Sequence, residues 1–153
     1  MQTLITRPAT VADIDTLRLF EQGVIEAERP YDPTLKNGTI YYYDLELLIN
    51  SPASVLMVVE LDGELVASGY ARVETAEPYL LHPQHAYLGF MYTHPTHRGK
   101  GLNRLVLDAL KQWARERGIT ELRLEVYHHN QSAIRAYEKA GFNQLMIEMR
   151  MGI

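Results

Sequence analysis

The stretch His97-Arg98-Gly99-Lys100-Gly101-Leu102-Asn103 decides the fold, because it joins a strand-like segment that ends at Pro95 to a strongly periodic helix. Two glycines at i and i+2 permit a tight turn and leave no Cβ between the main chain and a ligand. The following helix directs its unpaired N–H groups and the positive end of its dipole towards the turn. Arg98, Lys100 and Arg104 add positive charge there. Together these features predict a cradle for a phosphate or pyrophosphate group.

A plain glycine turn with solvated charges is the alternative interpretation of this stretch. The local charge argues against it, because the chain has a formal net charge of −4 while this window carries only positive charges. The residues also exclude two familiar nucleotide loops. Gly101 follows Lys100 where a P-loop needs Ser or Thr, and Arg104 stands where a dinucleotide-binding loop needs its third glycine.

Length and composition predict one globular domain over residues 1–153, with 46% hydrophobic and 22% charged residues. The mild acidity argues against a nucleic-acid partner, since no basic stripe extends beyond the one loop. No apolar segment approaches the length of a membrane span, and the first residues lack the apolar core of a signal peptide. The chain has no cysteine, which excludes disulfides and thiol catalysis. We therefore expect no membrane partner and a cytoplasmic location.

The periodicity of apolar residues predicts alternating strands and helices. Helices are expected at about 10–28, 42–50, 102–117 and 130–140, and the helix that starts at Leu102 has the clearest apolar stripe. Strands are expected at 3–7, 55–61, 64–74, 85–93 and 122–126, with Asp62-Gly63 as a hairpin turn. Residues 142–151 are expected to form a terminal strand or hairpin. This order predicts an α/β (α+β) fold with a mixed sheet and helices on both faces.

A second motif, Asn130-Gln131-Ser132-Ala133-Ile134-Arg135-Ala136-Tyr137-Glu138-Lys139-Ala140-Gly141-Phe142, follows directly on a predicted strand. With the strand that ends in Tyr92-Thr93-His94-Pro95 and the turn Arg98-Gly99-Lys100-Gly101, it resembles the GNAT superfamily of acyl-CoA-dependent N-acyltransferases. The likeness spans about 85–142. It implies a mainly antiparallel central sheet that is splayed between its fourth and fifth strands. One position departs from the family, which usually has Gly or Ala where this chain has Asn103.

The resemblance implies that acetyl-CoA, or another short acyl-CoA, binds in the splay between the strand ending near Thr93 and the strand around Glu125. Backbone N–H groups at about 99–104 would hold the pyrophosphate, and the main chain of Tyr92 and Thr93 would pair with the pantetheine arm like an added strand. Asn130 would contact the pantetheine or order its loop, and it also fits a helix N-cap. The expected cofactor-binding residues are Tyr92, Thr93, Arg98, Gly99, Lys100, Gly101, Leu102, Asn103, Arg104 and Asn130.

The same resemblance implies that Tyr137 protonates the leaving thiolate; the alternative is a core aromatic residue. The proton acceptor differs from that of many family members, which carry a glutamate near the positions of Gly89 and Phe90, where this chain has none. Glu125 is the expected catalytic base and resembles the glutamate that acts through water in the branch that acetylates protein N-termini. Its alternative role is a solvent-facing residue paired with Arg123 or Lys139. His85 and Tyr87 are reserve candidates for the base.

Acceptor selectivity is expected from the first two helices and their connector. Carboxylates and aromatic rings there suit a cationic amine, although a solvated acidic helix face is the alternative. This acidic group comprises Glu21, Glu26, Glu28, Asp32, Asp44 and Glu46, with Tyr41, Tyr42 and Tyr43 among them. The expected substrate-binding residues are Glu28, Tyr31, Tyr43, His85 and Tyr87. No metal site is expected, because His94, His97, His128 and His129 lack acidic partners at ligand spacing.

The resemblance therefore implies an N-acetyltransferase that moves an acetyl group from acetyl-CoA to a primary amine by direct attack. The partner is then a small-molecule amine or a peptide. One alternative is a protein lysine or N-terminal acetyltransferase, and another is a non-catalytic acyl-CoA sensor. A homodimer through the apolar terminal strand is a further possibility.

Overall fold

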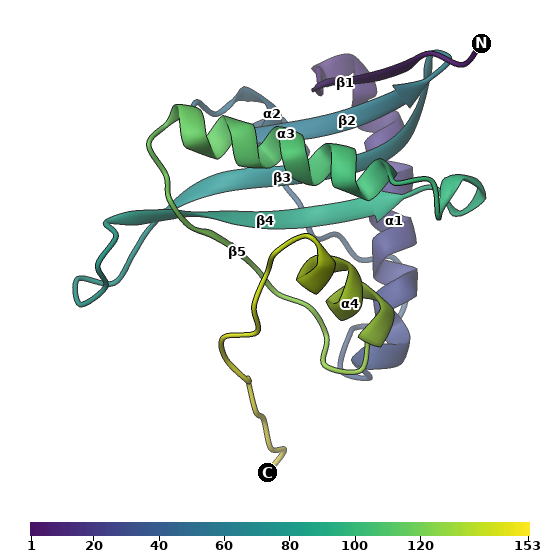
Figure 1. Ribbon diagram of the computed structural model, residues 1–153. Coiled ribbons are helices and arrows are strands. Elements are labelled where there is room, and N and C mark those ends of the chain that lie inside the picture. The colour runs from purple at the N-terminus through teal and green to yellow at the C-terminus, as the bar shows by residue number, and fades with distance from the viewer.

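A central sheet of five strands organises the chain, and the computed structural model describes all of residues 1–153 (Figure 1). The strands are β1 (Leu4–Pro8), β2 (Ser54–Leu61), β3 (Glu64–Thr75), β4 (Gln84–Thr93) and β5 (Leu122–Leu124). They lie in the order β1-β2-β3-β4-β5, antiparallel except for the parallel pair β4–β5. The β2–β3 hairpin turns at Asp62 and Gly63, whose φ values of 51° and 86° fit a tight two-residue turn.

Helices cover both faces of the sheet, as the sequence predicts. The helices are α1 (Ile14–Glu28), α2 (Leu45–Asn50), α3 (Leu102–Glu116) and α4 (Gln131–Lys139), with short 3₁₀ turns at Val11–Asp13, Arg29–Tyr31 and Pro95–His97. One core lies between the sheet and the first two helices and includes Leu17, Leu45 and Phe90. The other lies under α3, and α4 joins the same side through Tyr137 and Ala140.

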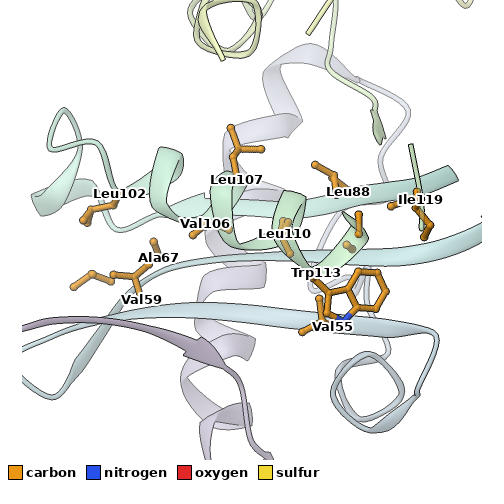
Figure 2. Close-up of a cluster of buried hydrophobic side chains, with 14 of the residues drawn as sticks. Val55, Val59, Ala67, Leu88, Leu102, Val106, Leu107, Leu110, Trp113 and Ile119 are labelled. Atoms are coloured by element: carbon orange, nitrogen blue, oxygen red, sulfur yellow. The ribbon is translucent and has the colours of Figure 1, made fainter. Parts of the chain in front are cut away.

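The apolar stripe of α3 fixes the position of the glycine turn that precedes it. Leu102, Val106, Leu110 and Trp113 are buried against β2 and β3 (Figure 2). Burial of each such apolar side chain stabilises the fold by roughly 1.5–3 kcal/mol relative to leaving it exposed. The start of α3 is therefore held firmly against the sheet at the end of β4.

The splay between β4 and β5 is present. Their pairing runs only from Ala86↔Leu122 to Leu88↔Leu124, whereas β4 continues to Thr93. Residues 89–93 of β4 therefore have no ladder partner on the β5 side, and a backbone edge remains open next to the turn that leads to α3.

Two element predictions need correction. The second helix begins at Leu45 and not near residue 42, because the main-chain N–H groups of Tyr42 and Tyr43 donate to buried Glu21 (2.8 Å each) and Asp44 caps the helix through Leu47 N–H (3.0 Å). The predicted terminal strand or hairpin at 142–151 is wrong. This segment has no regular structure and no strand beside it, and an alternating pattern can identify a potential face but cannot supply a ladder partner.

Candidate active site

The glycine turn ends in an uncapped helix N-terminus. Gly99 and Gly101 both have φ of 77°, a conformation that L side chains rarely adopt, and a Cβ added at either would meet nothing within 4 Å. The left-handed backbone conformation, and not a lack of space for a Cβ, therefore explains why glycine stands at both positions. Gly101 occupies the N-cap position of α3, where no side chain accepts from the first-turn N–H groups. These N–H groups and the helix dipole are available to an anion.

The three cations near this turn differ in their partners. Arg104 pairs with Asp108 one turn along α3 (3.1 Å), which neutralises part of its charge. Arg98 donates weakly to the Thr93 carbonyl (3.4 Å), and Lys100 lies 3.3 Å from His97 Nδ1. Since neither of these two contacts involves a carboxylate, most of the uncompensated positive charge at the turn comes from Arg98 and Lys100.

A bulge in β4 lies where the strand separates from β5. In the pairing of β3 with β4, Tyr70 lies opposite Gly89 and Ser68 lies opposite Tyr92. Phe90 and Met91 of β4 therefore lie opposite the single residue Gly69 of β3. Phe90 has φ of 56°, which is unusual for a bulky residue, and its carbonyl accepts a buried hydrogen bond from the Ser68 hydroxyl (3.1 Å). Bulges of this kind re-aim a strand and occur often beside active sites.

Tyr70 explains why no carboxylate side chain extends from β4 at position 89. A Cβ at Gly89 would overlap the Tyr70 ring and hydroxyl. Tyr70 is buried, and this burial raises its pKa. The space that a side chain at 89 would need therefore holds a neutral phenol.

Tyr137 lies on α4 and is mostly buried against the α3-side core, with its ring 5.9 Å from that of Phe142. Burial raises the pKa of Tyr137 to about 12, and the negative charge of Glu28 acts in the same direction. At the start of α4, Asn130 accepts from Ala133 N–H (3.3 Å), so its role as an N-cap is confirmed. The side-chain NH₂ of an N-capping asparagine takes no part in the cap.

Glu28 faces a group of tyrosines at the C-terminal end of α1. Burial raises its pKa, while a hydrogen bond from Tyr42 acts in the opposite direction. The Tyr42 pKa is raised by burial and by Glu28. Tyr43 stacks on Phe90 at the bulge (ring centroids 4.5 Å apart), and burial also raises its pKa. A half-buried carboxylate thus lies among protonated phenols and close enough to Tyr137 to affect its ionisation.

The connector after α1 adds a second acidic position. Tyr31 stacks on Tyr127 (5.7 Å), and the Tyr127 hydroxyl lies 3.5 Å from Asp32. Arg150 donates to Asp32 (2.8 Å) and to Thr34 Oγ1 (2.8 Å). Hydrogen bonds from Thr34 are the main reason why the Asp32 pKa is lowered to about 2, and those from Arg150 add to the effect.

Glu125 lies on the other side of the splay, just after β5. It is exposed and accepts from the Tyr87 hydroxyl (3.2 Å), whose pKa is raised mainly by burial and then by Glu125. Arg123 pairs with Glu121 (2.6 Å) and not with Glu125. His85 is buried near the start of β4 and pairs with Glu74 (3.3 Å), so the structure does not bring it to the bulge.

Several acidic residues of the expected acceptor face have structural roles instead. Glu21 is fully buried and binds the connector main chain and Arg18 (2.9 Å), Glu26 pairs with Arg29 (2.8 Å), and Asp44 caps α2. Sequence reasoning missed the importance of Tyr70, Tyr127 and Arg150, because their relevance depends on contacts across distant parts of the chain. No group of three or more His, Asp or Glu residues is arranged to hold a metal ion, and no helix is long and apolar enough to cross a membrane.

Comparison with known proteins adds a family match. A family model described as "Acetyltransferase (GNAT) family" matches residues 21–142. The "Uncharacterized N-acetyltransferase YdgE" of Bacillus subtilis (strain 168) is 41% identical over 71 residues, which is 46% of this chain and 45% of that protein. The streptothricin acetyltransferase of Streptomyces lavendulae is 34% identical over 93 residues, 61% of this chain and 46% of that protein. The matched region thus spans about half the length of these relatives.

Solved structures share the fold over nearly the whole chain. A mutant of the BH1408 protein from Bacillus halodurans has a TM-score of 0.88 at 19% identity and covers 97% of this chain and 99% of its own. The "predicted acetyltransferase with acetyl-CoA" from Clostridium acetobutylicum has a TM-score of 0.77 at 23% identity, with coverage of 98% and 96%. At these identities the likeness establishes the fold.

Proposed function

The chain belongs to the acetyltransferase (GNAT) family, and from that premise we propose that it transfers an acetyl group from acetyl-CoA to a primary amine of a small molecule. One observation carries the proposal: the unpaired part of β4, residues 89–93, leads through the glycine turn to an uncapped helix N-terminus, and Tyr137 of α4 packs against the core under that helix. We further propose that residues 1–153 act together as one domain.

The proposed coenzyme site uses mainly backbone groups. The pantetheine arm would pair with the open edge at Tyr92 and Thr93, and the pyrophosphate would accept from N–H groups of residues 99–104. Arg98 and Lys100 would supply positive charge. Arg104, Leu102 and Asn103 line the first turn of α3, where Asn103 can donate an additional hydrogen bond. Asn130 would use its free amide group towards the pantetheine arm while it caps α4.

In the proposed reaction the bound ammonium group first loses a proton to water, and the neutral amine then attacks the thioester carbonyl directly. A C–N bond forms, the C–S bond breaks, and the departing thiolate takes a proton from Tyr137 while the amine releases one to Glu125, directly or through water. With its pKa raised to about 12, Tyr137 stays protonated at neutral pH. Proton transfer from Tyr137 to a thiolate of reference pKa about 8.5 is uphill by roughly 5 kcal/mol, so it must accompany C–S cleavage.

The proposed acceptor is a cationic amine that enters from the side of Glu28, Tyr31 and Tyr43, with Tyr87 next to Glu125. His85 remains a proposed contact only for an acceptor long enough to reach the start of β4. The electron-rich faces of Tyr31 and Tyr43 and the carboxylate of Glu28 favour such a cation. The names of two relatives, the streptothricin acetyltransferase and the aminoglycoside N(6')-acetyltransferase of Stenotrophomonas maltophilia (28% identical over 100 residues), also favour a small-molecule amine.

A protein acceptor is the alternative within the same chemistry. A lysine amine of pKa about 10.4 is neutral only ~0.04% of the time at pH 7, so its deprotonation costs about 4.6 kcal/mol. Deprotonation of a protein α-amine costs only about 1 kcal/mol.

A non-catalytic acyl-CoA sensor is the alternative from another functional class. The absence of a β4 carboxylate gives it little support, because Tyr70 occupies the space at Gly89 and other carboxylates flank the splay.

Release of free thiol from acetyl-CoA tests the proposal. The wild-type chain is assayed against small polyamines, aminoglycosides, and peptides with a free N-terminus or an internal lysine, and coenzyme A binding is followed by calorimetry. We expect binding together with turnover of at least one small-molecule amine. Turnover of peptides alone would favour the protein acetyltransferase, and binding without turnover of any amine would favour the sensor. No coenzyme A binding would refute both the reaction and the site.

A further inference from the structure

Arg72 of β3 supplies the one positive charge in a pocket between α2 and the sheet. The pocket has a volume of about 320 Å³, and most of the residues around it are apolar or aromatic. They include Tyr42, Tyr43, Leu48 and Tyr70. A largely apolar pocket with a few polar groups that can orient a ligand is typical of a small-molecule site.

The carboxylate and the two serine hydroxyls of this pocket already have partners. Asp44 caps α2, the Ser51 hydroxyl accepts from a main-chain N–H (3.1 Å), and the Ser54 hydroxyl donates to the Leu48 carbonyl (2.9 Å). Asp44 reduces the positive potential of the pocket but has no proton to donate at neutral pH. Arg72 is therefore the only charged donor in the pocket.

The neighbours of the Arg72 guanidinium group hold it in one orientation. Its Nε donates to Glu74 (2.9 Å), and Glu74 also pairs with His85 (3.3 Å). Its Cζ lies 4.7 Å from the centre of the Tyr87 ring and 5.7 Å from that of Tyr70, at which distances an aromatic face attracts a cation. Because the group is already ordered, less rotamer entropy is lost when it binds a ligand.

The Nη side of the same guanidinium group has no carboxylate partner. Glu74 takes the Nε–H group, and the only other hydrogen bond of Arg72 is a long one from Nη1 to the Tyr70 hydroxyl (3.5 Å). The N–H groups on Nη1 and Nη2 can therefore donate to the two oxygens of one carboxylate. The side chain is 47% exposed, so a ligand in solution can reach it.

Tyr87 connects this arginine to the proposed site of acetyl transfer. Its ring lies under the Arg72 guanidinium group, while its hydroxyl donates to Glu125 (3.2 Å), the proposed proton acceptor. Tyr70, the second ring beside Arg72, fills the space at Gly89 where β4 separates from β5. The width of one tyrosine side chain therefore separates a fixed cation from the group that would receive the amine proton.

We infer that the acceptor is a small molecule that carries a carboxylate as well as its primary amine, and that Arg72 binds this carboxylate. The inference rests on the proposed acetyl transfer and names the class of its substrate. An ammonium group alone is repelled by Arg72, which then contributes nothing to its binding. A carboxylate on a short spacer turns the same charge into a contact that selects between acceptors.

Matched pairs of amines test the inference through thiol release from acetyl-CoA. β-Alanine, γ-aminobutyrate and ε-aminohexanoate are each assayed beside the corresponding carboxamide, which keeps the amine and the spacer and removes the negative charge. For at least one pair we expect the wild type to have a kcat/KM at least about tenfold higher for the carboxylate, mainly through a lower KM. Arg72→Gln should remove this preference, and Arg72→Lys should retain part of it. Arg115→Gln, an exposed position on α3 at the other face of the sheet, is the matched control and should keep it.

The outcomes distinguish this inference from the proposed function. Equal kcat/KM within every pair, or a carboxylate preference that persists in Arg72→Gln, would overturn the role of Arg72 and leave acetyl transfer standing. Acetylation only of amines that lack a carboxylate would do the same. Thiol release with no amine at all would overturn acetyl transfer and this inference together. Partial unfolding of Arg72→Gln would lower both rates of a pair equally, so the ratio within a pair remains decisive.

Discussion

Tyr137→Phe is the most informative single substitution, because it removes one hydroxyl and retains the ring that packs beside Phe142 and the core under α3. The size of the effect follows from the acid that would replace the phenol. Water has a pKa of about 15.7 and Tyr137 one of about 12, a difference worth about 5 kcal/mol. If about half of that difference is expressed in the transition state, kcat falls by roughly 70-fold.

The assay is steady-state release of free thiol with the best amine from the panel. We expect kcat to fall while the KM for acetyl-CoA stays within about twofold, since the proposed coenzyme contacts are elsewhere. Tyr79→Phe is the matched control, because Tyr79 is 82% exposed in the loop between β3 and β4. An unchanged kcat for Tyr137→Phe would refute the role of Tyr137 as proton donor. A lower Tm of Tyr137→Phe than of the wild type would instead attribute the loss of kcat to weakened packing.

Three further outcomes are expected. Gly101→Ala forces an L side chain into a left-handed conformation, so it should lower stability by about 1 kcal/mol and weaken coenzyme A binding in calorimetry; unchanged binding would contradict the helix N-terminal cradle. Glu28→Gln should raise the KM for a cationic amine while Glu125→Gln lowers kcat; the reverse pattern would exchange the two proposed roles. The pKa of Asp13 is lowered, mainly by its hydrogen bond from Arg7, so the stabilisation from this pair should be complete above about pH 4 and should decrease as the pH falls further. Urea unfolding should therefore show a smaller acid-dependent loss of stability for Arg7→Met than for the wild type. An equal loss in both proteins would exclude this pair as its cause.

Local sequence patterns predicted the parts of the fold that depend on neighbouring residues. The stripe on α3 predicted its buried face, and Asp62-Gly63 predicted the hairpin turn. The splay between β4 and β5 followed from the family resemblance, which rests on motifs at both of its sides. Each of these features involves residues close together in sequence or in fixed motif order.

Features that depend on distant partners could not be predicted in this way. The bulge at Phe90 requires the register between β3 and β4, which no single segment encodes. The sequence places Glu21 in an acidic helix face, because its burial under the connector depends on the positions of Tyr42 and Tyr43 in the fold. Residues 142–151 illustrate the same limit, since alternation identifies a potential strand but does not supply a neighbouring strand for it to pair with.

The contact between Tyr70 and Gly89 links two positions that must change together during divergence of this active site. A mutation that introduces an acidic side chain at position 89 must displace or remove the phenol at position 70, and loss of the phenol alone leaves a void beside the bulge. Descendants of this chain therefore reach a β4 glutamate only through a less stable intermediate. This barrier favours a proton acceptor on a different structural element, as we propose for Glu125.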